Sequence, residues 1–150
     1  MFEKLFSAFK KKPVNIGVEH GKWGEDIAAK YIFRKGWKIL ERNSRPCSRD
    51  RRLEIDIVAY DEKTDTIIFV EVKQHKSHSE YERRLRSINS KKKRNMRIAC
   101  RSWIRSHKWQ SGFRFDVIEI FGTPEESNFE LDHIERVNIF VPADKFVRWT

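Results

Sequence analysis

The sequence predicts an α/β domain in which a central mixed β-sheet is flanked by helices. Two long stretches carry apolar residues at helical spacing, and five shorter ones have the apolar patterns of strands. Their order is one helix, three strands, a second helix and two strands, which indicates a sheet covered by helices. A chain of 150 residues fits a single domain, which we assign to residues 15–150, with residues 1–14 as an N-terminal extension.

The composition excludes several classes of protein. Hydrophobic residues make up 39% of the chain and include 11 Phe and 5 Trp, which excludes a disordered chain although 36% of the residues are charged. No apolar run approaches the ~20 residues that a membrane-spanning helix needs, and there is no signal-peptide pattern. Cys47 and Cys100 are too few for a disulfide framework or a thiolate zinc site. We therefore expect a cytoplasmic protein with free thiols.

The extension, residues 1–14, has the pattern of a short basic amphipathic helix. Its apolar and basic residues are Phe2, Leu5, Phe6 and Phe9, followed by Lys10, Lys11 and Lys12. Such a segment can bind a membrane surface, so a membrane-surface adaptor is one alternative function. The simpler alternative is that the segment packs on its own domain or frays, and we expect no membrane partner.

The first elements of the domain are a helix over residues 15–35 and a strand over residues 37–42. The apolar stripe of the helix consists of Ile27, Ala28, Tyr31 and Ile32. Gly36 supplies the signal that ends the helix. Pro46 and the polar, basic composition around it predict a loop over residues 43–52.

Residues 53–61 and 66–73 alternate as the two strands of a hairpin, joined by a four-residue loop. One predicted face of the first strand consists of Leu53, Ile55, Ile57 and Ala59. The predicted faces of the second strand are Ile68, Val70 and Val72 on one side, and Ile67, Phe69, Glu71 and Lys73 on the other.

The length of the loop sets the register of this hairpin. Pairing the two residues that flank the loop places Asp56 opposite Glu71, and Glu54 opposite Lys73. Directly opposed side chains have Cβ atoms only ~4.5–5.5 Å apart. One patch of the sheet is therefore predicted to gather three carboxylates and one ammonium group.

The remaining elements are a second helix over residues 87–107 and strands over residues 113–121 and 136–141. A polar loop that contains His75 and His78 precedes the helix. The apolar stripe of the helix consists of Met96, Ala99, Cys100, Trp103 and Ile104. The opposite face carries a basic stripe of Arg94, Arg97, Arg101, Arg105 and Lys108.

The net charge of +10 is concentrated in one segment. Residues 74–108 contain 12 Lys or Arg and two acidic residues, whereas the rest of the chain is balanced. This concentration indicates contact with a polyanion such as nucleic acid, and a solvated helix face is the alternative. Nothing resembles a base-reading module, so we expect contacts to the phosphate backbone. The predicted nucleic-acid contacts are Arg42, Arg45, Lys91, Lys92, Arg94, Arg97 and Arg101.

The paired carboxylates of the hairpin predict a metal site. Asp56 and Glu71 repel each other on one face unless a cation or a proton lies between them. Mg²⁺ suits such oxygen ligands and keeps waters for substrate phosphates. Lys73 shares the face of Glu71, so its ammonium group can position an attacking water or stabilise a charged transition state. The alternative is a solvated face with a Glu54–Lys73 salt bridge.

Glu25 adds a further acid from the first helix. It precedes Ala28 and Ala29 by three and four residues, so it lies beside the stripe that faces the core. A carboxylate at that edge should point toward the sheet. There it can complete the water shell of a metal or bind a second ion.

Five groups of residues follow one another in a distinctive order. They are Gly21 to Glu25 with Ala28, Ala29 and Tyr31; Gly36 with Ile39 to Asn43 and Arg45; Glu54 to Ala59; Phe69 to Lys73; and Arg114 to Val117. In this order and spacing they resemble the YraN-like family of predicted endonucleases. That family belongs to the PD-(D/E)XK nuclease superfamily and is similar to archaeal Holliday junction resolvases. The resemblance covers residues 21–120.

The resemblance implies a restriction-endonuclease-like fold with three layers, a central mixed sheet between helices. It implies that the active site consists of Glu25, Asp56, Glu71 and Lys73. Asp56 and Glu71 would bind the metal, with the Val72 carbonyl as a further ligand. Lys73 would act on water or phosphate, while Glu25 supports the site from the helix and Glu54 is a further supporting residue.

We therefore expect a Mg²⁺- or Mn²⁺-dependent endonuclease that hydrolyses DNA, with branched or damaged DNA in repair or recombination as candidate substrates. The alternative is a nucleic-acid-binding protein whose nuclease site is weak or silent. Resolvases usually act as dimers because they cut two strands, so a homodimer is one expected assembly. The family usually has Gly where this chain has Leu53, and we expect the larger side chain to narrow the approach of the DNA backbone.

Overall fold

The structure is a computed structural model that describes residues 15–79 and 90–140. The predicted extension, residues 1–14, lies outside the described residues. Within the described part of the chain, no helix has both the length and the apolar character needed to cross a membrane.

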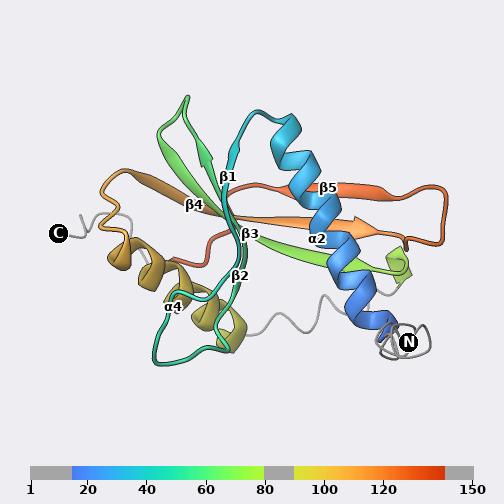
Figure 1. The fold of residues 1–150 in the computed structure, drawn as a ribbon, viewed down its shortest axis with the longest axis horizontal. Helices are drawn as coiled ribbons and strands as arrows, with labels where there is room; N and C mark the ends of the chain where they lie inside the picture. The colour runs from blue at the N-terminus through green and yellow to red at the C-terminus, as the bar shows by residue number, and fades with distance from the viewer. Residues whose placement is uncertain (1–14, 80–89, 141–150) are drawn as a thin grey trace, which may run out of the picture.

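The described residues form two helices and five strands in the predicted order. The elements are α2 (Ile16–Arg34), β1 (Lys38–Ser44), β2 (Ile55–Asp61), β3 (Thr66–His75), α4 (Ser90–Ser106), β4 (Gly112–Phe121) and β5 (Glu130–Ile134). The strands form one sheet in the order β1-β2-β3-β4-β5 (Figure 1). Adjacent strands are antiparallel except β3 and β4, which are parallel and are joined by the connection that contains α4.

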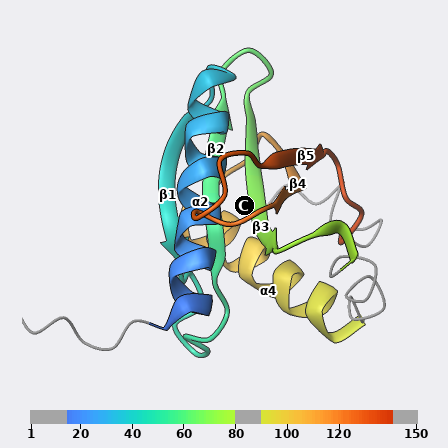
Figure 2. The same cartoon turned by 90° about the vertical axis from the view of Figure 1, so that its right-hand side faces the viewer.

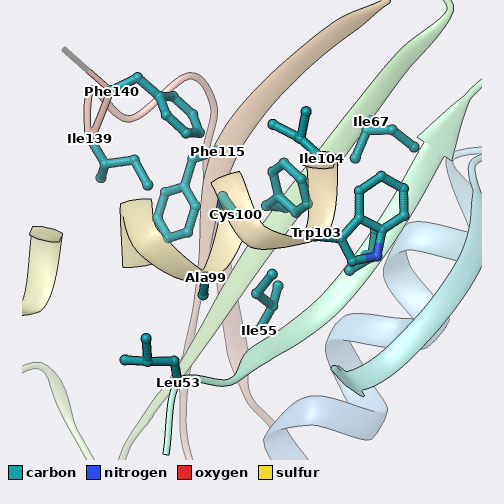
Figure 3. Packing of buried hydrophobic residues seen from close by; sticks show 12 residues of the cluster. Leu53, Ile55, Ile67, Ala99, Cys100, Trp103, Ile104, Phe115, Ile139 and Phe140 are labelled. Atoms are coloured by element: carbon teal, nitrogen blue, oxygen red, sulfur yellow. The ribbon is translucent and has the colours of Figure 1, made fainter. Parts of the chain in front are cut away.

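The two helices cover opposite faces of this sheet (Figures 1 and 2). The α2 cluster of buried residues contains Ala28, Ala29, Ile32, Trp37, Ile57, Ala59, Ile68, Val70, Ile118 and Ile120. The α4 cluster, seen in Figure 3, contains Leu53, Ile55, Val58, Ile67, Phe69, Ala99, Cys100, Trp103, Ile104, Phe115, Ile139 and Phe140. Successive strand residues such as Ile67 and Ile68 fall in different clusters because they point to opposite faces. The predicted α/β class, a mixed sheet between helices, is confirmed.

Both helices occupy the predicted segments. The Asn15 side chain caps α2 by accepting a hydrogen bond from the backbone N–H of Gly17 at 3.1 Å. Gly36 follows the helix with a φ of 85°, a conformation that glycine adopts at little cost. α4 corresponds to the predicted helix over residues 87–107, of which residues 87–89 lie outside the described part of the chain.

The β2–β3 hairpin has the predicted register. Asp61 pairs with Thr66, and the pairing continues without a shift to Ile57 and Val70. The turn between the strands therefore consists of residues 62–65, as the loop length predicts. This register brings the acidic ends of the two strands toward the same end of the sheet.

The predicted face of β2 is wrong at the start of the strand. Leu53 and Ile55 belong to the α4 cluster, whereas Ile57 and Ala59 belong to the α2 cluster. The residues before Ile57 lie outside the β2–β3 ladder, which ends at Ile57 and Val70, so the alternation of the paired strand does not extend to them. Both faces of the sheet are covered by a helix, so their apolar side chains are buried on either side.

The last strand lies earlier in the chain than predicted. β5 consists of residues 130–134 and pairs with β4, while the predicted strand over residues 136–141 forms none of the sheet within the described residues. Val137 instead donates one backbone hydrogen bond to the Phe115 carbonyl at 2.8 Å. Ile139 is buried against the α4 cluster. The apolar residues after β5 are therefore buried as an irregular segment.

Two strands continue beyond their predicted C-terminal ends. β1 continues to Ser44, and β3 continues to His75 because its parallel partner β4 extends to Phe121. His75 is therefore a strand residue and not part of the predicted loop. It is buried, and its ring stacks on that of Phe121 with centroids 5.2 Å apart. His78 lies beyond β3, is exposed, and pairs with Glu130 at 2.7 Å.

Candidate metal site

Asp56 lies beside the end of the β2–β3 pairing, next to Ile57. Its Oδ2 atom accepts a hydrogen bond from the backbone N–H of Val72 at 2.7 Å. This bond ties the half-buried carboxylate to β3 at the point where the ladder ends. It also places Asp56 next to Glu71, whose charge acts on it.

Glu71 and Lys73 form an ion pair on β3. The Nζ atom of Lys73 lies 3.3 Å from Oε1 of Glu71, and the two side chains are 31% and 20% exposed. In the parallel register Glu71 neighbours Val117 of β4. The α2 side of β3 is occupied at this point by Val72, whose side chain packs against the α2 cluster. The ion pair therefore lies on the α4 side of the sheet.

Glu25 and Glu54 bring two more carboxylates to Asp56. One oxygen of each residue lies within 4.8 Å of the others. The Asn43 side chain joins them, donating to Oε2 of Glu25 at 3.2 Å and to Oε1 of Glu54 at 3.0 Å. Asn43 has a φ of 50°, which Asn tolerates better than most residues. Side chains from α2, β1 and the start of β2 thus converge on one point.

The environment of Asp56 opposes its negative charge. Burial is the largest cause, and together with the charges of Glu71 and Glu25 it raises the pKa of Asp56 to about 8. The hydrogen bond from Val72 lowers the pKa but does not overcome these effects. Such a carboxyl group holds a proton at neutral pH unless a cation takes its place. An all-oxygen donor set with excess negative charge fits Mg²⁺ or Mn²⁺.

The acids nearest to Asp56 differ in part from the predicted ligand pair. Asp56 and Glu71 are neighbours as expected, but the group of oxygens within 4.8 Å consists of Glu25, Glu54 and Asp56. Glu71 is outside this group and forms an ion pair with Lys73. The backbone N–H of Val72 is engaged with Asp56, which orients this peptide unit beside the carboxylates.

Glu54 does not form the salt bridge with Lys73 that the alternative of a solvated face implies. It pairs instead with Arg45, whose Nη2 atom lies 2.8 Å from Oε2. Arg42, the other predicted nucleic-acid contact outside α4, pairs with Asp26 at 2.6 Å and lies 4.0 Å from Glu25. These two arginines thus neutralise acids at the rim of the site.

A cleft of about 450 Å³ opens over Asp56, Glu71 and Lys73. Its other polar lining residues are Arg52, Glu54, Lys92, Lys93 and Asn95. Its apolar lining residues are Leu53, Met96, Phe115, Val117, Val137 and Ile139. The cleft therefore combines carboxylates, cations and an apolar surface in one space.

The predicted cations of α4 occupy different surroundings. Lys92 lines the cleft, while Lys91 and Arg94 are exposed on the same turn of the helix. Arg97 donates to the Ile139 carbonyl at 3.1 Å, and Arg101 is half-buried. At least Arg97 of the basic stripe therefore contacts the protein itself, whereas the cations at the start of α4 are exposed.

Two cations of the cleft were not among the predicted site residues. Lys93 belongs to the basic run at the start of α4, and Arg52 directly precedes Leu53. Their positions next to predicted site residues are the signal that would have found them. Asn43 was also not predicted, because its role depends on the contact between α2 and the start of β2.

A second polar cluster lies on β4 and β5, away from this cleft. The buried Asp116 accepts hydrogen bonds from His133 at 2.8 Å and from the backbone N–H of Arg136 at 2.9 Å. Arg114 lies 3.2 Å from Asp116 and 3.2 Å from Glu135. Burial opposes ionisation of Asp116, but these contacts outweigh it and lower its pKa. These contacts hold β5 and the residues after it against β4.

Comparison with known proteins identifies the family. The model of the uncharacterised protein family UPF0102 matches residues 24–120 of this chain. The chain belongs to the UPF0102 family. The matched segment includes Glu25, Asp56, Glu71 and Lys73, and it coincides closely with the predicted YraN-like resemblance over residues 21–120. β5 lies beyond it.

Several UPF0102 proteins are similar to this chain over most of their length. A UPF0102 protein from Syntrophomonas wolfei is 35% identical over 123 residues, which is 81% of this chain and 97% of the relative. One from Caldicellulosiruptor bescii is 39% identical over 67% of this chain and 81% of its own. One from Thermotoga petrophila is 38% identical over 77% of this chain and 94% of its own.

Proposed function

We propose that this UPF0102 protein is a divalent-metal-dependent endonuclease of the PD-(D/E)XK superfamily that hydrolyses phosphodiester bonds in DNA. The observation that carries the proposal is the gathering of carboxylates around Asp56, beside Lys73, in a cleft with cations at its rim. Burying such acids together is costly without a cation. The neighbouring acids and burial raise the pKa of Asp56, and this raised pKa supports a site that binds a cation.

The donor set supports binding of Mg²⁺ or Mn²⁺. Asp56 and Glu71, with the Val72 carbonyl, are the proposed ligands. Glu25 and Glu54 offer further oxygens for waters of the coordination shell or for a second ion. When bound, the cation lowers the pKa of a water and neutralises charge that develops on the phosphodiester.

Lys73 is the residue that we propose to contact the attacking water or the phosphate. Its ammonium group lies 3.3 Å from Glu71 and is partly exposed to the cleft, so it can reach a water or a phosphate oxygen there. A fixed positive charge at this position would orient the attacking water and stabilise the transition state. Glu25 would support the site through its hydrogen bond with Asn43, which also holds Glu54.

The cations that line the cleft support a polyanionic substrate. Arg52, Lys92 and Lys93 flank the carboxylates, and Lys91 and Arg94 extend the positive surface along α4. Contacts of this kind bind the phosphate backbone and not particular bases. We therefore propose recognition of DNA structure, with branched or damaged DNA as the substrate class.

The test is cleavage of single strands, duplexes, flaps and four-way junctions with Mg²⁺ or Mn²⁺. The wild type is compared with Lys73→Ala and with Lys63→Ala, a control in the exposed hairpin turn. We expect metal-dependent cleavage of at least one substrate, lost in Lys73→Ala and kept in Lys63→Ala. Salt-sensitive binding without cleavage of any substrate would favour a nucleic-acid-binding protein with a silent site. Cleavage that persists in EDTA would contradict the proposed metal site.

A further inference from the structure

The cleft has an apolar half that the proposed hydrolysis does not use. Phe115 and Val117 of β4 form its floor, since Val117 neighbours Glu71 in the parallel register and Phe115 neighbours Phe69. Neighbouring strands lie about 4.8 Å apart, so this floor begins one strand spacing from Glu71 on β3. Met96 of α4 lines the same space.

One wall of the cleft is the irregular segment after β5. Val137 and Ile139 line the cleft from this segment. The backbone N–H of Val137 donates to the Phe115 carbonyl at 2.8 Å, and Arg97 donates to the Ile139 carbonyl at 3.1 Å. Hydrogen bonds from both β4 and α4 thus hold the wall in place, and the apolar half is preformed.

The two halves of the cleft suit a ligand that has both an anionic group and an apolar group. Lys73, Lys92 and Lys93 favour an anionic group beside the carboxylates. The floor and walls formed by Phe115, Val117 and the residues around them favour a flat apolar group. The volume of about 450 Å³ lies within the range of about 300–1,000 Å³ that is typical of small-ligand pockets. A nucleotide carries a phosphate and a base close enough together to occupy both halves of the cleft.

We propose that the apolar half of the cleft binds one unpaired nucleobase whose phosphate lies beside Asp56 and Glu71. The inference rests on the proposed nuclease function and specifies its substrate as DNA with a nucleotide out of the helical stack. A base inside a duplex is paired and stacked on both faces, so it cannot enter such a pocket without first leaving the helix. Flaps, bulges and damaged sites supply unpaired bases at the lowest cost.

The test is equilibrium binding to two duplexes that differ in one group. Each duplex contains one unpaired nucleotide, an adenosine in the first and an abasic tetrahydrofuran analogue in the second. Binding is measured by fluorescence anisotropy with the full chain in EDTA, so that no cleavage takes place. We expect the wild type to bind the adenosine duplex about tenfold more tightly, as one stacked base would give.

Two variants that fill the apolar half test the location of the pocket. Val117→Phe and Met96→Trp should reduce the preference to about twofold or less and leave affinity for the abasic duplex unchanged. Leu40→Phe, at an exposed position of β1 outside the cleft, should keep the full preference. Circular dichroism shows whether each variant is folded. If only one of the two filling variants folds, that variant is sufficient for the test.

The outcomes separate this inference from the proposed function. Equal affinity of the wild type for both duplexes, or a preference that survives both filling variants, would overturn the pocket and leave the nuclease proposal standing. A base preference without cleavage under any condition would keep the pocket and overturn the nuclease. The wild type could bind both duplexes equally while Val117→Phe changes its oligomeric state. That result would overturn the base pocket and assign the apolar half to an interface with a second copy of this chain.

Discussion

The Asp56 carboxylate accepts a hydrogen bond from the backbone N–H of Val72 at 2.7 Å. This contact joins β2 and β3 beside the end of their ladder and brings the acid next to Glu71. A side chain held by backbone has little freedom to turn away from its neighbours. The carboxyl groups are therefore held together before any cation binds, and this arrangement raises the pKa of Asp56.

Asp56→Asn is expected to stabilise the metal-free protein at alkaline pH. The folded-state pKa of about 8 lies above the ordinary value of 3.8 for an aspartate, so the folded state binds this proton more tightly than the unfolded state. Stability is therefore lost as the pH rises from about 4 to about 8, and Asn removes that loss.

Urea unfolding in EDTA measures this effect. We expect the free energy of unfolding of Asp56→Asn to exceed that of the wild type by on the order of 2 kcal/mol at pH 9, with no difference near pH 4. Asp132→Asn, at an exposed position of β5, serves as the control. A variant less stable than the wild type at pH 9 would show that the Asp56 charge is favourable in the fold.

Mg²⁺ or Mn²⁺ is expected to raise the Tm of the wild type. A ligand at 100 times its Kd stabilises the folded state by about 2.7 kcal/mol. The rise in Tm should disappear in Asp56→Asn, shrink in Glu71→Gln and remain in Glu62→Gln, which lies in the exposed hairpin turn. Calorimetry with metal and with EDTA gives the comparison. An equal rise in all four proteins would place the metal elsewhere.

Asn43 is expected to position Glu25 and Glu54 for the metal. Asn43→Gly keeps the backbone conformation with φ near 50° but removes both hydrogen bonds. We expect it to weaken Mn²⁺ binding about tenfold, a typical effect of losing a residue that orients ligands. Asn43→Ala should weaken binding similarly and lose roughly 1 kcal/mol of stability from its strained backbone.

Titration calorimetry with Mn²⁺ measures the affinity of these variants. Asn128→Gly, in the exposed turn before β5, is the matched control and should bind Mn²⁺ as the wild type does. Unchanged affinity in Asn43→Gly would mean that its two hydrogen bonds stabilise the fold only.

Lys92 and Lys93 are expected to contact phosphates directly. Each contact contributes about −0.9 to the slope of log affinity against log salt concentration for duplex DNA. Removing both in Lys92→Ala/Lys93→Ala should therefore reduce the magnitude of the slope by about 2. Binding titrations at several salt concentrations, with Lys63→Ala as control, give this slope. A slope identical to that of the wild type would exclude these lysines from the interface.

The hairpin and the first helix could be predicted because they depend on local sequence. The four-residue turn sets the pairing of Asp61 with Thr66, and that pairing determines where Asp56 and Glu71 meet. Asn15 and Gly36 likewise mark the ends of α2 through short-range backbone effects. Such signals require no knowledge of the rest of the fold.

The errors concern features that depend on distant residues. β5 was missed because its stability depends on contacts of His133 with Asp116 at 2.8 Å and with Tyr31 at 3.0 Å. Residues 136–141 are more apolar and therefore resemble a strand more closely. The pairing of Glu54 with Arg45 was likewise not predicted, since it depends on the path of residues 43–52. Local patterns carry no information on such partners.

The most direct test of the account is cleavage and binding of the same DNA by Asp56→Asn. With Mn²⁺ present, we expect the variant to lose at least about a hundredfold in cleavage rate, because the metal loses its central ligand. DNA affinity should remain within about threefold, since Lys92 and Lys93 are intact. Cleavage by Asp56→Asn at the rate of the wild type would contradict the proposed site.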